Sequence, residues 1–245
     1  MKKREFLFCS LILNIVLITM AFVFIHQKGG LSHLKNMLGN TSTLHKNSIS
    51  LVKEEAKTIS STKHHDVVFL GDSHTEYFEW GEYFLGITVS NQGIAGDTSK
   101  KLLERLNQVK AVTPKKIFLM IGINDLKKGL SVQQVSDYYK EIINVIIRDN
   151  PDVKLYTQSV LYVNRNKFPM YFKKNANKLN KKVQDLNKEI ERLSNTRKNI
   201  NYIDVNNVLQ EKDELPGDLT VDGLHLNAKG YKKWTEHLSP YIKER

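Results

Sequence analysis

Short apolar segments alternate with amphipathic segments from Asp66 onward, and this alternation restricts the fold more than any other feature of the chain. The segments that we predict to be strands are Val67–Leu70, Ile87–Ser90, Ile117–Ile121, Leu155–Leu161 and Ile200–Val205. Their nearly continuous apolar composition is typical of strands that are covered on both faces. We therefore predict an α/β fold in which a five-stranded parallel sheet carries helices on both sides.

Helical patterns occupy the intervals between these strands. Apolar residues recur every three or four positions in the stretches 102–109, 132–146 and 179–193, and a last helix follows Asn227. Ser131 and Gln134 form a capping-box pattern at the start of the second stretch. The spacing in 179–193 also fits a coiled coil, but it covers only about two heptads, so core packing is the better interpretation.

Four motifs rich in glycine and polar residues follow one another in a fixed order. They are Gly71-Asp72-Ser73-His74, Gly93-Ile94-Ala95-Gly96-Asp97-Thr98, Gly122-Ile123-Asn124-Asp125 and Asp222-Gly223-Leu224-His225. The first three lie just beyond predicted strands, where open parallel sheets bind their ligands, and the fourth follows the last strand. Together they contain every part that acyl transfer through a serine requires.

Each candidate site residue has a chemical role and an ordinary structural alternative. We predict Ser73 as nucleophile, His225 as its base and Asp222 as the group that orients the imidazole. The backbone N–H groups of Ser73 and Gly96 and the side-chain amide of Asn124 would form the oxyanion hole. Taken singly, Ser73 is equally well a helix cap, Gly96 and Asn124 turn residues, and Asp222 and His225 a cap and a surface histidine. The ordered set of four motifs favours the catalytic interpretation.

His74 is adjacent to Ser73, but we do not expect it to be the base. Neighbouring side chains at the start of a helix diverge, so His74 is expected to line the rim of the pocket or to be exposed. Asp222 and His225 are too few for a tetrahedral metal site, and the pair His64-His65 is better explained as exposed. The sequence therefore predicts neither a metal nor a cofactor.

The motifs resemble those of the SGNH, or GDSL-like, hydrolases. The resemblance covers about Asp66 to Tyr241. Within the family, the sequence is most similar to the branch of the platelet-activating-factor acetylhydrolase subunits and bacterial lipase/acylhydrolases. The resemblance implies a flavodoxin-like three-layer sandwich. It also implies that Ser73, Asp222 and His225 are catalytic, and that Ser73, Gly96 and Asn124 form the oxyanion hole. His74 departs from the family name, because it stands where the name has leucine.

Charge and cysteine content limit the other functions. The formal net charge is +11 over 245 residues, and +6 of it lies in residues 1–65. Basic and aromatic residues do not alternate in the way that binds single-stranded nucleic acid, so no nucleic-acid partner is predicted. The single cysteine, Cys9, lies in the apolar N-terminal segment, so the remaining chain has no disulfide and no thiolate site. The sequence leaves the oligomeric state open.

The N-terminal segment has the pattern of a membrane anchor. Lys2, Lys3 and Arg4 precede an uncharged run from Phe6 to Ile25, which as a helix would span about 30 Å. We expect a signal anchor in residues 1–27, a polar tether in 28–63 and a hydrolase domain in 64–245. The basic cluster then stays in the cytoplasm and the domain lies outside the cell membrane. A cleaved signal peptide, and hence secretion, is the alternative.

These features predict a membrane-anchored extracytoplasmic serine esterase. Its substrate would be a short acyl ester, such as an acetyl ester, of a glycan, wall polymer or lipid. An O-acyltransferase with the same serine, histidine and aspartate is the first alternative. A surface-binding module without catalysis is the second, and the presence of all four motifs argues against it.

Overall fold

The computed structural model describes residues 65–107, 113–164 and 176–244, together with 8, 10, 11, 13–20, 23, 52, 55 and 56. The chain divides into two compact units, Met1–Val52 and Lys53–Arg245. In the first unit, residues 13–20 are helical and carry exposed apolar side chains. No helix within these described ranges is both long and apolar enough to cross a membrane. The predicted anchor and tether, and their boundaries at 27 and 63, fall largely outside these ranges.

A parallel sheet forms the centre of the second unit. Its strands are β1 (Val67–Gly71), β2 (Val89–Gly93), β3 (Lys116–Met120), β4 (Lys154–Gln158) and β5 (Ile200–Ile203). Their spatial order is β2-β1-β3-β4-β5, and every neighbouring pair is parallel. This order confirms the predicted α/β fold with a five-stranded, flavodoxin-like sheet. It also places the topological switch point between β1 and β3, where such sheets bind ligands beyond their carboxyl ends.

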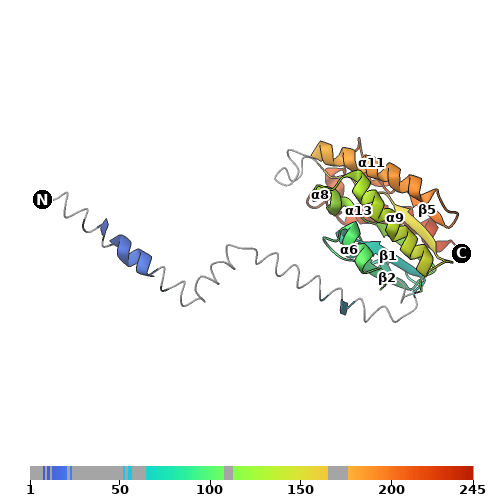
Figure 1. Ribbon diagram of the computed structural model, residues 1–245, viewed down its shortest axis with the longest axis horizontal. Coiled ribbons are helices and arrows are strands. Elements are labelled where there is room, and N and C mark those ends of the chain that lie inside the picture. The colour runs from blue at the N-terminus through green and yellow to red at the C-terminus, as the bar shows by residue number, and fades with distance from the viewer. Residues whose placement is uncertain are drawn as a thin grey trace. The chain divides into compact units, whose positions relative to one another are not determined.

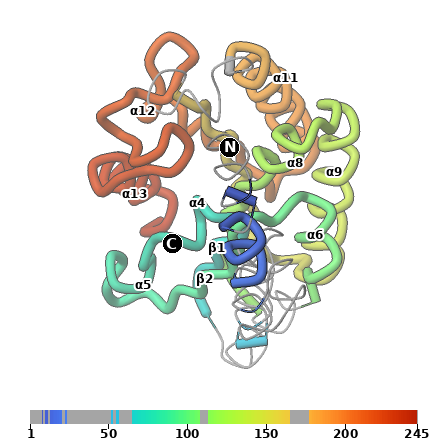
Figure 2. The backbone as a smooth tube through the Cα atoms, turned by 90° about the vertical axis from the view of Figure 1, so that its left-hand side faces the viewer, coloured from blue at the N-terminus to red at the C-terminus, as the bar shows by residue number. Residues whose placement is uncertain are grey.

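Helices cover both faces of this sheet, as Figures 1 and 2 show. The first group is α6 (Ser99–Glu104), α8 (Ile123–Lys127), α9 (Val132–Asp149) and α11 (Ala176–Ser194). The second group is α5 (Trp80–Tyr83), α12 (Asn206–Leu209) and α13 (Ala228–Lys243). Two further short elements are α4 (Ser73–Glu76) and the 3-10 turn η1 (Gly217–Leu219). The three-layer arrangement predicted from the family resemblance is therefore present.

The strands of the sheet supply two separate hydrophobic cores. In β1, Val68 and Leu70 join the core under α9 and α11, whereas Val67 and Phe69 join the core under α13. The alternation follows from the two-residue period of a strand, which sends successive side chains to opposite faces. Because both faces are covered, β1 and β3 contain only buried residues. The loops beyond their ends are therefore attached to rigid, buried strands.

The second strand begins and ends later than the sequence predicts. We expected Ile87–Ser90, whereas β2 is Val89–Gly93. The polar residues of its second half have partners: Asn91 Nδ2 donates to the carbonyl oxygens of Glu76 and Phe78, and Gln92 Nε2 donates to Ser90 Oγ. The prediction was wrong because apolar content alone does not reveal a strand whose polar side chains donate to nearby backbone and hydroxyl oxygens.

The fourth strand ends before its predicted limit at Leu161. It ends at Gln158; the N–H of Ser159 still donates to the carbonyl of Ile203 in β5, and from Val160 onward the backbone pairs with a helix side chain instead of a strand. The amide of Asn187 in α11 accepts from the N–H of Val160 at 2.8 Å and donates to its carbonyl at 2.9 Å. A single asparagine thus replaces a strand partner, and apolar residues continue beyond the sheet.

Candidate active site

Ser73 occupies the turn between β1 and α4, at the carboxyl edge of the sheet. It is the first residue of α4, and Asp72 caps this helix by accepting from the His74 N–H at 3.0 Å. The turn is tight: a Cβ on Gly71 would lie 2.3 Å from the carbonyl oxygen of Met120. Glycine at position 71 therefore allows β1 and β3 to approach closely where the serine emerges.

Ser73, His225 and Asp222 form one hydrogen-bonded chain. Ser73 Oγ lies 3.0 Å from Nε2 of His225, and Nδ1 of the same ring lies 2.6 Å from Oδ2 of Asp222. Asp222 Oδ1 also accepts the backbone N–H groups of Leu224 and His225, at 2.9 and 2.7 Å. Residues 152 positions apart in the sequence thus meet, in the arrangement of a nucleophile, a base and an orienting carboxylate.

Thr220 holds the loop that carries Asp222 and His225. Its hydroxyl donates to the carbonyl of His225 at 2.6 Å and accepts the N–H of Gly223 at 2.9 Å. Gly223 has a φ of 84°, a left-handed conformation that glycine adopts without strain. The sequence analysis did not identify Thr220. Its position two residues before Asp222 was the available signal, since threonine and aspartate side chains often accept backbone N–H groups in turns.

The pKa values of Asp222 and His225 are both lowered, which favours a neutral imidazole as the base. Partial burial acts to raise the pKa of Asp222, but hydrogen bonds from the N–H and ring of His225 and from the Leu224 N–H hold it below 3.8. Burial, reinforced by the nearby His74, lowers the pKa of His225 below 6.5, although Asp222 opposes this. Asp222 is therefore ionised and His225 neutral near neutral pH, so that Nε2 can accept a proton.

The three predicted oxyanion donors all lie at the carboxyl edge of the sheet. Among the described residues, neither the N–H of Ser73 nor that of Gly96 has a hydrogen-bond acceptor. Gly96 has a φ of 84°, which suits a residue without a Cβ. Asn124 uses one amide hydrogen on the carbonyl of Asp97 at 2.9 Å, and its second amide hydrogen remains available for a ligand.

Buried carboxylates connect the loops that carry these donors. Arg105 Nε donates to Asp97 Oδ2 at 2.8 Å, which fixes the residue that follows Gly96. Asp125 accepts the N–H of Ser99 at 3.0 Å and its hydroxyl at 2.6 Å. We did not predict these links, although Asp97 and Asp125 stand inside the quoted motifs; charged residues there are a signal for such internal bonds.

The comparison with known families decides the identity of this fold and site. The sequence model of the GDSL-like Lipase/Acylhydrolase family matches residues 69–233, which contain all four motifs. The chain belongs to this family. The predicted resemblance to GDSL-like hydrolases is confirmed.

Individual relatives of this GDSL-like hydrolase agree with the assignment. It is 27% identical over 188 residues to platelet-activating factor acetylhydrolase IB subunit alpha2 of Rattus norvegicus, covering 74% of this chain and 77% of the relative. A solved structure from Streptococcus pneumoniae, described as a platelet activating factor, is 27% identical with a TM-score of 0.74, covering 85% of this chain and 98% of that chain. A GDSL-like lipase from Bacteroides thetaiotaomicron, 22% identical, shares the fold with a TM-score of 0.61 over 76% of this chain and 89% of its own. The chain is thus a serine hydrolase of the GDSL type that acts on ester bonds.

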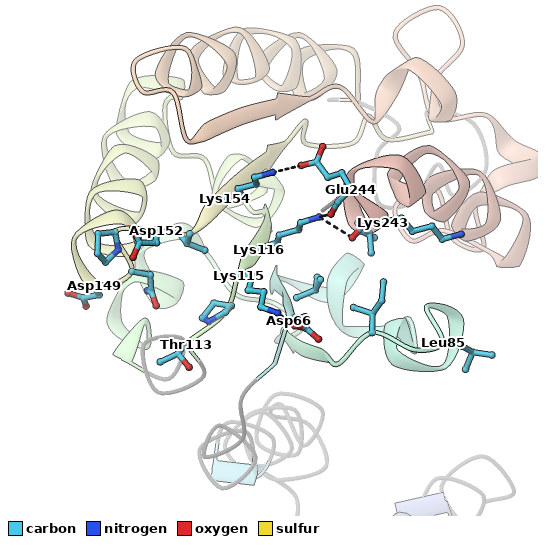
Figure 3. Close-up of a pocket in the computed structure, with 17 residues that line it drawn as sticks. Asp66, Leu85, Thr113, Lys115, Lys116, Asp149, Asp152, Lys154, Lys243 and Glu244 are labelled. Carbon is cyan, nitrogen blue, oxygen red and sulfur yellow. Dashed lines mark hydrogen bonds and ion pairs between the residues drawn. The ribbon is translucent and has the colours of Figure 1, made fainter.

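A separate pocket of about 1020 Å³ lies at the opposite, amino-terminal edge of the sheet of this hydrolase (Figure 3). Three of its four lysines, Lys115, Lys116 and Lys154, already have partners within the protein. Lys116 Nζ donates to the carbonyl oxygens of Tyr241, Ile242 and Glu244, and Lys154 Nζ lies 3.2 Å from the Glu244 carboxylate. None of the four motifs contributes to this pocket. The candidate active site is therefore the Ser73 edge.

The prediction for His74 was wrong. Its side chain is neither exposed nor at a rim, because only 1% of it is accessible. It lies between Asp72 Oδ1 at 3.1 Å and the carbonyl oxygen of Leu224 at 2.9 Å. Two polar partners inside the protein compensate for the loss of water, which the position in sequence did not reveal.

Proposed function

We propose that this GDSL-type hydrolase is a membrane-anchored extracytoplasmic serine esterase that removes short acyl groups through Ser73, His225 and Asp222. The observation that carries the proposal is the unbroken chain from Ser73 Oγ to His225 Nε2, at 3.0 Å, and from His225 Nδ1 to Asp222 Oδ2, at 2.6 Å. A serine hydroxyl is a weak nucleophile by itself, and this arrangement gives it a base with a fixed tautomer.

In the first half of the reaction, Ser73 Oγ attacks the ester carbonyl carbon while its proton passes to Nε2 of His225. The negative charge that develops on the carbonyl oxygen is accepted by the N–H groups of Ser73 and Gly96 and by the free amide hydrogen of Asn124. Each such donor lowers the barrier by roughly 3 kcal/mol. Asp222 stabilises the imidazolium that forms on His225.

In the second half, the tetrahedral intermediate collapses and the C–O bond to the alcohol breaks. The His225 imidazolium gives its proton to the departing alkoxide, which leaves an acyl group on Ser73. Water then donates a proton to His225 and attacks the acyl carbon, and the same oxyanion donors stabilise the second intermediate. The carboxylic acid departs and Ser73 regains its proton, so the enzyme returns to its initial state.

The preference for a short acyl group rests on the relatives. The rat relative, of which the match covers 77%, carries the word acetylhydrolase in its name. We extend this to the present chain as an acetyl or similarly short ester of a glycan, wall polymer or lipid. The preference for the alcohol part of the ester depends on surfaces beyond the residues that contact the carbonyl. It is therefore tested by comparing esters of different alcohols.

The direct test uses the full-length protein and its Ser73→Ala variant with nitrophenyl acetate, butyrate and octanoate. We expect turnover to be greatest with acetate and to disappear in the variant. Ser239→Ala, a half-buried serine of α13, is the matched control and should retain full activity. A fluorophosphonate probe followed by peptide mass analysis gives a result that does not depend on the chosen ester. Labelling at a serine other than 73 would overturn the assignment of the nucleophile.

The membrane location is proposed from the sequence of residues 1–27. The basic cluster before the apolar run from Phe6 to Ile25 supports an anchor whose N-terminus is cytoplasmic. Within this run, residues 13–20 are helical with exposed apolar side chains, which suits contact with lipid. We expect the protein to remain with membranes after alkaline washing, and its domain to be digested by protease added to spheroplasts. Release into the medium with a shortened N-terminus would favour the cleaved signal peptide.

A further inference from the structure

The imidazole of His74 lies between two hydrogen-bond acceptors. Its Nε2 is 2.9 Å from the carbonyl oxygen of Leu224, which has no hydrogen to donate. Its Nδ1 is 3.1 Å from Oδ1 of Asp72, and this oxygen also accepts the backbone N–H of His74 at 3.0 Å. An oxygen that already accepts one N–H is poorly placed to carry a proton of its own, so the proton between Asp72 and the ring belongs to Nδ1. Both ring nitrogens then carry hydrogen, and the ring is a cation.

His225 offers a contrast within the same site. Its Nδ1 also faces a carboxylate, that of Asp222, but its Nε2 faces the hydroxyl of Ser73, which has a hydrogen to donate. A neutral ring satisfies both contacts. The chemistry of one partner, a carbonyl for His74 and a hydroxyl for His225, thus separates an imidazole that donates from both nitrogens from one that is free to accept a proton.

The contact of His74 reaches the peptide unit that precedes His225. The carbonyl of Leu224 and the N–H of His225 belong to this one unit. His74 donates to its oxygen at 2.9 Å, and Asp222 Oδ1 accepts its N–H at 2.7 Å. A cation at one end and a carboxylate at the other both strengthen the dipole of the peptide and fix its plane. His74, the residue next to Ser73, therefore holds the Leu224–His225 peptide through a hydrogen bond to its carbonyl oxygen.

We propose that His74 is a positioning residue, held as an imidazolium, which fixes the Leu224–His225 peptide and favours the neutral form of His225. This inference rests on the proposed role of His225 as the base. The two rings have centroids 5.7 Å apart, close enough for the charge on one to oppose protonation of the other. Because His74 is buried, water screens this repulsion less than it would at the surface.

The groups around His74 agree with a charged ring. The ionisable ones that face it are Asp72 at the end of β1, His225 in the loop after η1, Lys127 of α8, and Tyr231 of α13, whose hydroxyl donates to the carbonyl of His74 at 2.9 Å. Burial acts to lower the pKa of His74, and Lys127 acts in the same direction. The hydrogen bond and charge of Asp72 and the carbonyl of Leu224 nevertheless raise that pKa above 6.5.

The first experiment observes the protons directly and does not depend on catalysis. Full-length protein labelled with nitrogen-15 in histidine is studied by NMR in detergent micelles near neutral pH, and His74 is assigned with the His74→Gln variant. We expect hydrogen on both ring nitrogens of His74 and on only one of His225. In His74→Gln, the titration of His225 should move to higher pH. A His74 ring with one bare nitrogen would overturn the proposal, whether or not Ser73 proves catalytic.

The second experiment separates the charge from the hydrogen bond. Glutamine at position 74 can donate to Leu224 but carries no charge, whereas His74→Leu loses both. We expect kcat near pH 8 to fall about threefold in the glutamine variant and about thirtyfold in the leucine variant, with KM changed less than about twofold. The acidic limb of the kcat/KM profile should move to higher pH in both. His237→Gln on α13 is the control and should change neither quantity.

The outcomes distinguish this inference from the function on which it rests. A doubly protonated His74 in a protein without esterase activity would remove the proposed function and leave the charge assignment standing. Esterase activity that requires Ser73, with an acidic limb unmoved in His74→Gln, would overturn the role of His74 alone. Equal losses in the glutamine and leucine variants, with melting temperatures lowered alike, would also overturn it, because they indicate only a structural contact.

Discussion

The side-chain amide of Asn124 donates to the backbone carbonyl of Asp97 across 2.9 Å, which joins the loop after β3 to the loop after β2. Asp97 is itself held by Arg105, and it directly follows Gly96. Two of the proposed oxyanion donors therefore have a common support. Donors fixed in this way need no reorganisation when charge develops on the substrate, which is the physical basis of their effect.

Replacing Asn124 by alanine should lower kcat by about 10²–10³ with little change in KM, because the lost hydrogen bond strengthens only in the transition state. Steady-state kinetics with nitrophenyl acetate measures both constants. Asn207→Ala, an exposed asparagine of α12, is the matched control. A variant at position 124 whose KM rises while kcat stays constant would show that the residue binds the ground state instead.

The pH profile should report the lowered pKa of His225. Burial first, and then the nearby His74, shift that pKa below 6.5. Because only the neutral ring can accept the proton of Ser73, kcat/KM should be fully developed above the shifted pKa and be lost as the pH falls through it. We expect the midpoint of the acidic limb below pH 6.5 in the wild-type enzyme. A midpoint above that value would contradict the assignment of His225 as the base.

Asp222→Asn should reduce kcat by about 10⁴, since the amide no longer selects the tautomer of His225 that accepts from Ser73. The charge of Asp222 raises the pKa of His225, so its removal should also move the residual acidic limb to lower pH. Rates at several pH values for wild type and variant test both effects. Asp185→Asn on the exposed face of α11 serves as the comparison. Unchanged kcat at position 222 would exclude it as the orienting carboxylate.

Gly93→Ala should destabilise the domain by roughly 3 kcal/mol, as overpacking at a rigid site does. A Cβ there would lie 2.3 Å from the backbone nitrogen of Glu76, and backbone cannot move aside as a side chain end can. Gly81→Ala in α5 is the matched control, because nothing lies within 4 Å of its added Cβ. Urea unfolding measures both free energies. Similar stability of the two variants would argue against this close approach of α4 to β2.

Arg105→Met should destabilise the domain by about 3–5 kcal/mol, because it leaves the buried carboxylate of Asp97 without its cation. Arg105 also donates to the carbonyl oxygens of Gln92 at 2.9 Å and Gly71 at 3.2 Å, so lysine should rescue only part of the loss. Lys181→Met removes an exposed pair and should change the free energy of unfolding by less than about 1 kcal/mol. If the two methionine variants unfold at the same urea concentration, the buried pair contributes no more than a surface one.

The sequence by itself determined the features that depend on neighbouring residues. The apolar runs of β1 and β3 were recognisable because both of their faces are buried. The capping box of Ser131 and Gln134 is present at the start of α9, since its bonds span only three residues. The first three motifs were recognisable at the ends of strands for the same reason, because the glycines and polar residues of a tight turn are local requirements.

Only the tertiary structure decided which polar groups meet. The bond from Ser73 to His225 joins residues 152 positions apart, and that from His74 to Leu224 joins residues 150 apart. No local pattern encodes such a contact, because its partners come together only when the sheet and its loops assemble. His74 therefore looked like a residue of the rim, and its burial became understandable only once Asp72 and the carbonyl of Leu224 were found on either side of its ring. Local chemistry selects the turns, whereas the surroundings of each buried polar group depend on distant parts of the chain.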